Sequence, residues 1–206
     1  LAAGPEPFYL QVGFFEPHRV FMRGDAKPDR EKGVSVPPFI KDEESSRQDF
    51  AEYQGTIRSL DAGVGRILAG LDAAGLRQNT LVLFTSDHGM PFPLAKCSVY
   101  DPGLQVPLIV RWPERGWVGG RVHDPMIPNV DVLPTLLDAV GLPSPAAVQG
   151  RSFIDLLDGR PYRRREEMFG EMTYHDYYDP MRCVRTERWK LIVFFTCCQG
   201  YMNPTQ

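Results

Sequence analysis

The 206-residue chain lacks several features that would place a protein in a class at once. It has no apolar stretch long enough to span a bilayer. It has no basic run of the kind that binds nucleic acid over a general surface, and its formal net charge is -3. Its four cysteines form no C-x-x-C pair, which disfavours a zinc ribbon or a thioredoxin-like site. We therefore expect no membrane span and no nucleic-acid partner.

The chain also lacks an initial methionine and a visible secretion signal. Leu1 leads within a few residues into an apolar segment, and the last residues, 201–206, end without a closing element. We interpret the chain as a fragment that lacks residues on both sides. Apolar residues make up 43% of the chain, which is enough to bury a sizeable core.

The rest of the chain is organised around residues 80–93, TLVLFTSDHGMPFP. This stretch opens with an apolar, β-rich run that is typical of a buried strand in a parallel sheet. Asp87 and His88 follow at the carboxyl end of that strand, where ligands bind in open α/β sheets. A carboxylate oxygen and an imidazole nitrogen can share one metal ion. The alternative is that Asp87 caps a turn and His88 is an ordinary loop residue.

Two more polar side chains lie just past strand-like segments. Residues 8–14 are apolar and β-rich, which predicts a second buried strand, and His18 follows it in the sequence FEPHR. Residues 105–112 predict another strand, so Lys96 lies on the loop between two strands. A lysine in that place can neutralise an anionic group of a substrate. The alternatives are a solvated His18 on a surface turn and a solvated Lys96.

The clearest predicted helix covers residues 46–76, where apolar residues recur at steps of three and four and Gly75 closes the pattern. Residues 131–140 predict a shorter helix with Asp131 as its N-cap. A long helix followed by a strand indicates an α/β unit and a mostly parallel sheet.

The C-terminal part begins with a charged segment, residues 160–167, which we interpret as a solvated seam. Residues 168–171 and 183–195 predict strands, the latter as a hairpin. Between them, residues 173–182 form a predicted loop crowded with Tyr, His and Asp. Such a composition suits a site for a sugar or an aryl group, and it equally suits an ordinary polar loop.

Several segments, taken in order, resemble the sulfatase family of the alkaline-phosphatase superfamily. They are FFEPHR (14–19), the helix with Tyr53, Asp61 and Gly65, TLVLFTSDHG (80–89), PLIVRWP (107–113), VDVLPTLLDAVGLP (130–143) and QGRSFIDLL (149–157). Within the family, TSDHGMPFPLAKCSVYDPG and DPMRCVR look most like the heparan N-sulfatase (sulfamidase) branch. The ordered set covers most of the chain.

The resemblance implies an alkaline-phosphatase-like α/β fold with a mostly parallel central sheet flanked by helices. Residues 1–160 would be part of that catalytic domain, and residues 161–206 the start of a smaller antiparallel C-terminal subdomain. The resemblance also implies a calcium ion and a formylglycine, made from Cys or Ser, whose hydrated aldehyde attacks sulfur.

By position in the family motifs, Asp87 and His88 would bind the metal. Lys96 would hold the sulfate, and His18 would contact the sulfate or the leaving group. His175, in the aromatic segment, is the expected contact to the rest of the substrate.

The sequence departs from the family pattern in three ways. The nucleophile signature, Cys or Ser followed by x-Pro-x-Arg, is absent, as are the paired acidic metal ligands of the family's first strand. Phe15 stands where many members have a further His. In the family the missing parts lie upstream, so we expect the isolated chain not to turn over substrate.

The resemblance therefore implies a hydrolase that releases sulfate from a sulfated carbohydrate, as in glycosaminoglycan degradation. One alternative is a phosphodiesterase or phosphonate hydrolase of the same superfamily, and another is a non-catalytic binding module. Family members are mostly exported or lysosomal, which is the location we expect. The sequence leaves the oligomeric state open.

Overall fold

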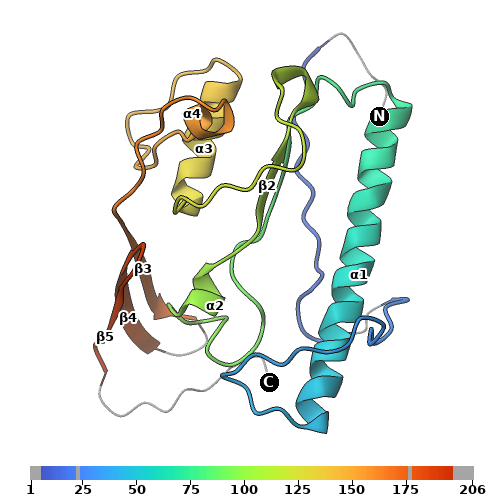
Figure 1. Cartoon of the computed structure of the whole chain (residues 1–206), viewed down its shortest axis with the longest axis vertical. Coiled ribbons are helices and arrows are strands. Elements are labelled where there is room, and N and C mark those ends of the chain that lie inside the picture. Colours follow the sequence, from blue (N-terminus) through green and yellow to red (C-terminus); the bar gives the residue numbers. More distant parts are fainter. Residues whose placement is uncertain (1–5, 22–23, 176–177, 197–206) are drawn as a thin grey trace.

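The computed structural model describes residues 6–21, 24–175 and 178–196. Helix α1 stands along one side, strands β1 and β2 lie in the middle, and α3, α4 and a second sheet occupy the other side (Figure 1). The helices and strands are α1 (Glu44–Ala73), β1 (Val82–Thr85), α2 (Asp101–Leu104), β2 (Leu108–Arg111), α3 (Val132–Ala139), α4 (Ile154–Leu157), β3 (Glu167–Tyr174), β4 (Tyr178–Thr186) and β5 (Lys190–Phe194), with 3-10 turns η1 (Pro113–Arg115) and η2 (Asn129–Asp131).

The long helix α1 confirms the prediction over residues 46–76. Its Phe50 is buried in a cluster with Phe21 and Phe92, and the rings of Phe50 and Phe92 stack with centroids 3.9 Å apart. Gly75 adopts φ +70° just past the helix, and its N–H donates to the Asp72 carbonyl at 3.0 Å. A positive φ is the reason that glycine closes this helix. The helix therefore fixes the segment before it and the loop after β1 against one apolar face.

Strands β1 and β2 confirm the predicted strands, but they pair antiparallel, from Val82 opposite Arg111 to Thr85 opposite Leu108. The prediction of parallel pairing is wrong for these two strands. The connection between them folds up at the carboxyl end of β1, where the Gly89 N–H donates to the Gly103 carbonyl at 2.9 Å. The chain thus re-enters the sheet at the end where it left, whereas a parallel pair needs a crossover that returns along the sheet.

Residues 8–14 do not form the predicted strand. They run between α1 and the β1–β2 pair (Figure 1), yet none of the described strands pairs with them. Tyr9 is 81% exposed. The Phe14 ring lies against α1, so close that a Cβ at Gly63 would come within 2.6 Å of it. Apolar β-rich composition suits a pleated, half-buried surface, but a strand also requires a partner in the ladder.

Contrary to the prediction, the Asp131 side chain does not cap α3. Asp131 ends the turn η2 with φ -82° and ψ -11°, and its side chain makes no capping bond. A capping side chain needs an extended backbone, which this turn does not allow. The carboxylate is instead fully buried, where it accepts hydrogen bonds from the Arg165 guanidinium and from the Arg151 N–H, the latter at 2.8 Å. Residues 160–167 are therefore not simply a solvated seam.

The C-terminal strands form a separate antiparallel sheet in the order β3-β4-β5, which confirms the predicted small antiparallel sheet. Thr186 and Trp189 close the β4–β5 hairpin through an N–H to carbonyl bond of 2.7 Å, as predicted. Residues 173, 174 and 178–182, predicted as a loop, belong to paired strands, so only a short tip connects β3 to β4. The boundary between residues 160 and 161 stays a prediction.

In the ranges that the structure describes, no helix combines the length and the apolar character that crossing a membrane requires.

Candidate active site

His18 and Lys96, 78 residues apart in the sequence, meet in the structure. The Lys96 Nζ atom lies 3.0 Å from His18 Nε2. An ammonium group can only donate, so Nε2 accepts. The other ring nitrogen, Nδ1, contacts the Arg19 carbonyl, which can only accept. The His18 ring thus directs Nε2 at the lysine and Nδ1 at a carbonyl, which is the arrangement of the tautomer with its proton on Nδ1.

Lys96 is held in place by a tightly folded loop. It is only 4% exposed, and its backbone N–H donates to the Met90 carbonyl at 3.1 Å. Leu94 and Cys97, on either side of it, have φ values of +59° and +62°, a conformation that L-residues rarely adopt. This burial excludes the alternative of a solvated surface lysine. A buried ammonium group needs polar partners.

Gly89 holds the two ends of this loop together. A Cβ at Gly89 would lie 1.7 Å from the Pro102 carbonyl oxygen, so only glycine lets the two backbones approach this closely. The loop that carries Lys96 therefore folds back onto the chain just after β1, where its two ends are joined by the Gly89 N–H and the Gly103 carbonyl.

Asp87 and His88 lie together at that strand end, as predicted. Asp87 Oδ2 is 3.6 Å from His88 Nε2, and Oδ1 accepts the His88 N–H at 3.0 Å. His88 Nδ1 is 2.8 Å from the Gly89 carbonyl and therefore donates to it. This leaves the Nε2 lone pair beside the carboxylate. A metal-binding histidine has the same arrangement, with its second ring nitrogen donating to a carbonyl.

These two donors make up part of a metal site at most. The Asp87 side chain is 84% exposed, so both of its oxygens can accept a cation. In the ranges that the structure describes, no group of three or more His, Cys, Asp or Glu side chains is arranged to hold a metal ion. The chemistry of Asp87 and His88, a carboxylate beside an imidazole nitrogen, thus fits part of the ligand set of a divalent cation.

The sequence analysis did not predict the contacts of Arg19, the residue directly after His18. Its guanidinium pairs with Asp49 of α1 and donates to the Pro91 carbonyl at 3.0 Å. The sequence contained one signal, an arginine between two segments rich in aromatic residues, but nothing in it identified the acidic partner.

His175 directly follows β3 and is exposed. Residues 176 and 177 lie outside the described residues. The substrate contact assigned to His175 stays a prediction.

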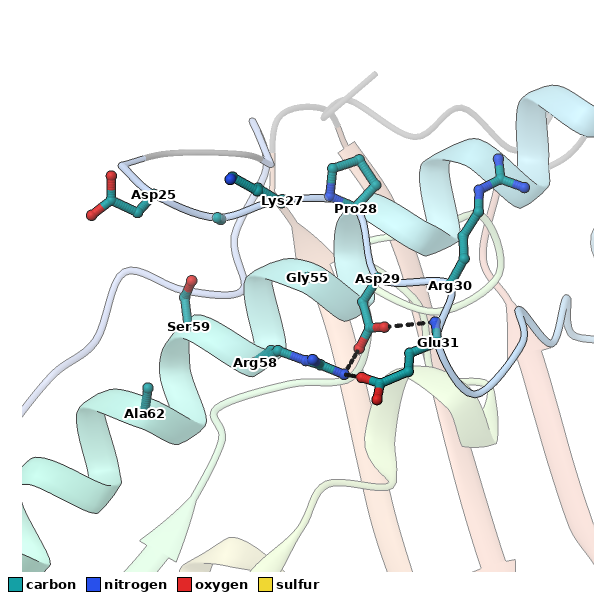
Figure 2. A pocket seen from close by; sticks show the side chains of 11 residues that line it. Asp25, Lys27, Pro28, Asp29, Arg30, Glu31, Gly55, Arg58, Ser59 and Ala62 are labelled. Atoms are coloured by element: carbon teal, nitrogen blue, oxygen red, sulfur yellow. Dashed lines mark hydrogen bonds and ion pairs between the residues drawn. The ribbon is translucent and has the colours of Figure 1, made fainter.

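An open cleft between residues 25–31 and α1 is a separate feature (Figure 2). Arg58 projects from α1 and pairs with Asp29 and Glu31, at 2.7 Å in each case. None of the five predicted site residues lines this cleft. Because these charges neutralise one another, we do not assign the active site to it.

Comparison with known proteins gives two overlapping family matches. Residues 1–142 match the family model described as Sulfatase, and residues 88–202 match the one described as N-sulphoglucosamine sulphohydrolase, C-terminal. The human N-sulphoglucosamine sulphohydrolase is 31% identical over 220 residues, which cover 90% of this chain and 43% of that protein. The chain thus spans less than half the length of this relative.

Two solved structures share the fold. The phosphonate monoester hydrolase of Silicibacter pomeroyi matches 76% of this chain and 35% of its own, with a TM-score of 0.63 and 29% identity. A 2-O GAG sulfatase matches 74% of this chain and 35% of its own, with a TM-score of 0.66 and 26% identity. These matches confirm the alkaline-phosphatase-like fold, and the two family matches confirm the resemblance to the sulfamidase branch. The chain belongs to the sulfatase family.

Proposed function

We propose that the protein containing this chain is a sulfatase that releases sulfate from a sulfated carbohydrate, as an ester or a sulfamate. The observation that carries the proposal is the contact between Lys96 and His18, formed by two loops that meet near the end of β1. Family membership supplies the class of reaction, and this contact supplies a cation and a proton-carrying group at one point.

Cleavage of a sulfate ester or sulfamate places negative charge on the sulfonyl oxygens and on the leaving atom. A buried ammonium group stabilises that charge far better than a solvated one, because water does not screen it. Lys96 would bind the sulfonyl oxygens. His18, once Nε2 has taken up a proton from solvent, would give that proton to the leaving oxygen or nitrogen, while Lys96 keeps its charge.

We propose that Asp87 and His88 hold the divalent cation, as the family resemblance implies, with calcium as the expected ion. A bound cation would supply further charge stabilisation for the sulfonyl group. Asp87 suits calcium, which prefers oxygen ligands, whereas the imidazole of His88 suits transition metals better. Titration of the natural-length protein with Ca²⁺ and with Zn²⁺ by calorimetry identifies the ion.

In that titration Asp87→Ala should abolish tight binding of whichever ion binds the wild type, while Asp124→Ala, at an exposed site, should not. Equal binding by the wild type and Asp87→Ala would remove Asp87 from the site. Absence of binding to the wild type would favour the non-catalytic binding module.

We propose that the nucleophile is a formylglycine outside this chain, since none of the 206 residues lies in a C/S-x-P-x-R sequence. The isolated chain should then release no sulfate. Peptide mapping of the protein from its native source should find formylglycine in a peptide that is absent from this sequence. An unmodified Cys or Ser at that position, or a Thr, would contradict the proposed nucleophile.

A phosphonate or phosphodiester hydrolase is the second candidate, favoured by the structural match to the phosphonate monoester hydrolase. Both reactions act on tetrahedral anions and need the same cationic groups. Rates on N-sulfoglucosamine, an aryl sulfate and a phosphonate monoester separate the two. We expect sulfate release to be the fastest reaction, and a faster phosphonate reaction would overturn the proposal.

Recognition of the sugar would involve His175. His175→Ala should reduce kcat/KM on N-sulfoglucosamine much more than on an aryl sulfate. Equal losses on both substrates would remove the case for sugar recognition by this residue. We further propose an exported or lysosomal location, which microscopy of the natural-length protein can test.

A further inference from the structure

The Arg19 side chain links three segments that lie far apart in the sequence. They are its own segment, helix α1 and the loop after β1. Arg19 Nη1 donates to Asp49 Oδ1 of α1 at 2.9 Å, and its Nη2 pairs with the other oxygen of the same carboxylate. Its Nε donates to the Pro91 carbonyl at 3.0 Å. A bidentate arginine–carboxylate pair fixes orientation as well as distance.

The surroundings of Arg19 make this contact strong. Its side chain is only 18% exposed. Its guanidinium carbon lies 4.5 Å from the ring centroid of Phe21 and 4.9 Å from that of Phe92. Arginine on aromatic faces in a partly dehydrated site is held more firmly than an exposed surface pair.

The contacts among Arg19, His18, Lys96 and Pro91 form a closed circuit that includes the His18–Lys96 pair. The Arg19 carbonyl accepts a hydrogen bond from His18 Nδ1–H, and His18 Nε2 meets Lys96 Nζ. Lys96 lies five residues after Pro91, whose carbonyl returns to the Arg19 guanidinium. Arg19 therefore acts at both ends of the contact: its backbone sets the tautomer of His18, and its side chain anchors the loop of Lys96.

We propose that Arg19, oriented by Asp49, is the positioning residue that keeps His18 in its Nδ1–H tautomer with Nε2 directed at Lys96. The inference rests on the proposed function for its kinetic consequence, although the geometry of the His18–Lys96 pair can be measured without turnover. A purely structural ion pair would affect stability and leave the histidine tautomer unchanged.

The test compares Arg19→Gln, Arg19→Lys and Asp49→Asn in the natural-length protein. Arg47→Gln is the matched control, because Arg47 also joins α1 to a neighbouring segment, by a 2.6 Å pair with Asp42. This pair does not include Arg19, His18, Lys96 or Pro91. Asp49→Asn keeps the shape of the side chain and serves if Arg19→Gln fails to fold.

The first readout is the tautomer of His18, from NMR spectra of protein with ¹⁵N-labelled histidine. The wild type and Arg47→Gln should show His18 with its proton on Nδ1, whereas Arg19→Gln and Asp49→Asn should show a mixture of tautomers. Unchanged His18 signals in both variants would overturn the inference, whether or not the protein proves to be a sulfatase.

The second readout is sulfate release. Arg19→Gln should lower kcat roughly 10- to 100-fold, since small misplacements of catalytic groups have effects of this size, with a smaller change in KM. Arg19→Lys should recover only part of the loss, because lysine cannot form the bidentate pair. A kcat that falls only in proportion to the unfolded fraction would reduce Arg19 to a structural anchor.

Discussion

Lys96 shows how the setting of one residue changes its chemistry. Lysines are almost never fully buried unless they are paired, and this one is buried with its Nζ against an imidazole nitrogen. Burial keeps water away from the ammonium group and strengthens its interaction with an anion. This setting suits the anion binding that we propose for Lys96.

Replacing Lys96 should affect catalysis much more than replacing an exposed lysine. We expect Lys96→Gln to lower kcat/KM by roughly 100-fold or more, the usual effect of removing a group that stabilises transition-state charge. Lys41→Gln is the control, because Lys41 is exposed and pairs with a neighbouring glutamate, Glu43. Similar rates in the two variants would remove Lys96 from the mechanism.

Asp158 is a residue whose charge stabilises the fold. Hydrogen bonding from Arg115 lowers the pKa of this carboxyl, burial opposes the shift, and the Trp117 indole N–H adds to the lowering. A carboxyl whose folded-state pKa is depressed stabilises the fold above the unfolded pKa, about 3.9, and loses that contribution as the pH falls through the folded value. We expect this stabilisation to be complete at neutral pH.

Asp158→Asn should therefore lower the free energy of unfolding by about 2 kcal/mol at pH 7, since it removes hydrogen bonds to a charged group. Below about pH 4 the difference from the wild type should shrink, because the wild-type carboxyl then becomes protonated. Urea unfolding at pH 7 and below about pH 4 measures the difference in free energy of unfolding, with the exposed Asp124→Asn as control. A difference that does not depend on pH would contradict the electrostatic explanation.

At the scale of elements, the connection between β1 and β2 decides where the site forms. Its two ends meet through Gly89 and Gly103, and this places Lys96 over the end of β1. The close approach at Gly89 leaves no room for a Cβ, so the loop depends on glycine for packing.

Gly89→Ala should destabilise the protein by about 1–3 kcal/mol, the usual cost of forcing atoms into a packed site. Gly65→Ala in α1 is the matched control: nothing lies within 4 Å of the added methyl, and alanine favours helix. We expect Gly65→Ala to raise the melting temperature and Gly89→Ala to lower it. Equal shifts in the two variants would contradict the close approach seen at Gly89.

Sequence patterns predicted the elements that are stabilised by their own residues. The apolar face of α1 and the hairpin of β4 and β5 follow from local periodicity, and both were confirmed. Local periodicity could not predict that residues 8–14 form no strand or that β1 and β2 pair antiparallel. Both depend on which strands lie next to one another, which periodicity does not encode.

The site residues follow the same division. Asp87 and His88 stood out because they follow an apolar run that is a strand, and Lys96 because it lies in the loop after that strand. His18 stood out for following an apolar run too, although residues 8–14 form no strand. The contact between His18 and Lys96 required two loops to meet, and Arg19 acquired its meaning only from that meeting.

At the scale of the molecule, the ion pair between Asp131 and Arg165 joins α3 to the segment that leads into β3. Arg165 Nε and Nη2 lie 2.8 and 2.5 Å from the two oxygens of a carboxylate that has no solvent exposure. Removing one partner of a buried pair leaves the other charge without compensation.

Arg165→Gln should therefore lower the free energy of unfolding by roughly 3–5 kcal/mol. Arg164→Gln is the control, because the neighbouring Arg164 is exposed and pairs weakly, at 3.5 Å, with an exposed glutamate. Thermal unfolding of the two variants measures the contrast. A loss in Arg165→Gln no larger than in the control would show that this pair does not stabilise the molecule.

The central proposal is that Lys96 and His18 bind the sulfate group of a sulfatase substrate and that Asp87 and His88 hold a divalent cation. A crystal structure of the natural-length protein with sulfate and calcium tests it most directly. The account predicts a sulfate ion within hydrogen-bond distance of Lys96 Nζ and His18 Nε2, and a cation on Asp87. Sulfate bound elsewhere, with Lys96 Nζ still in contact with His18 Nε2, would contradict it.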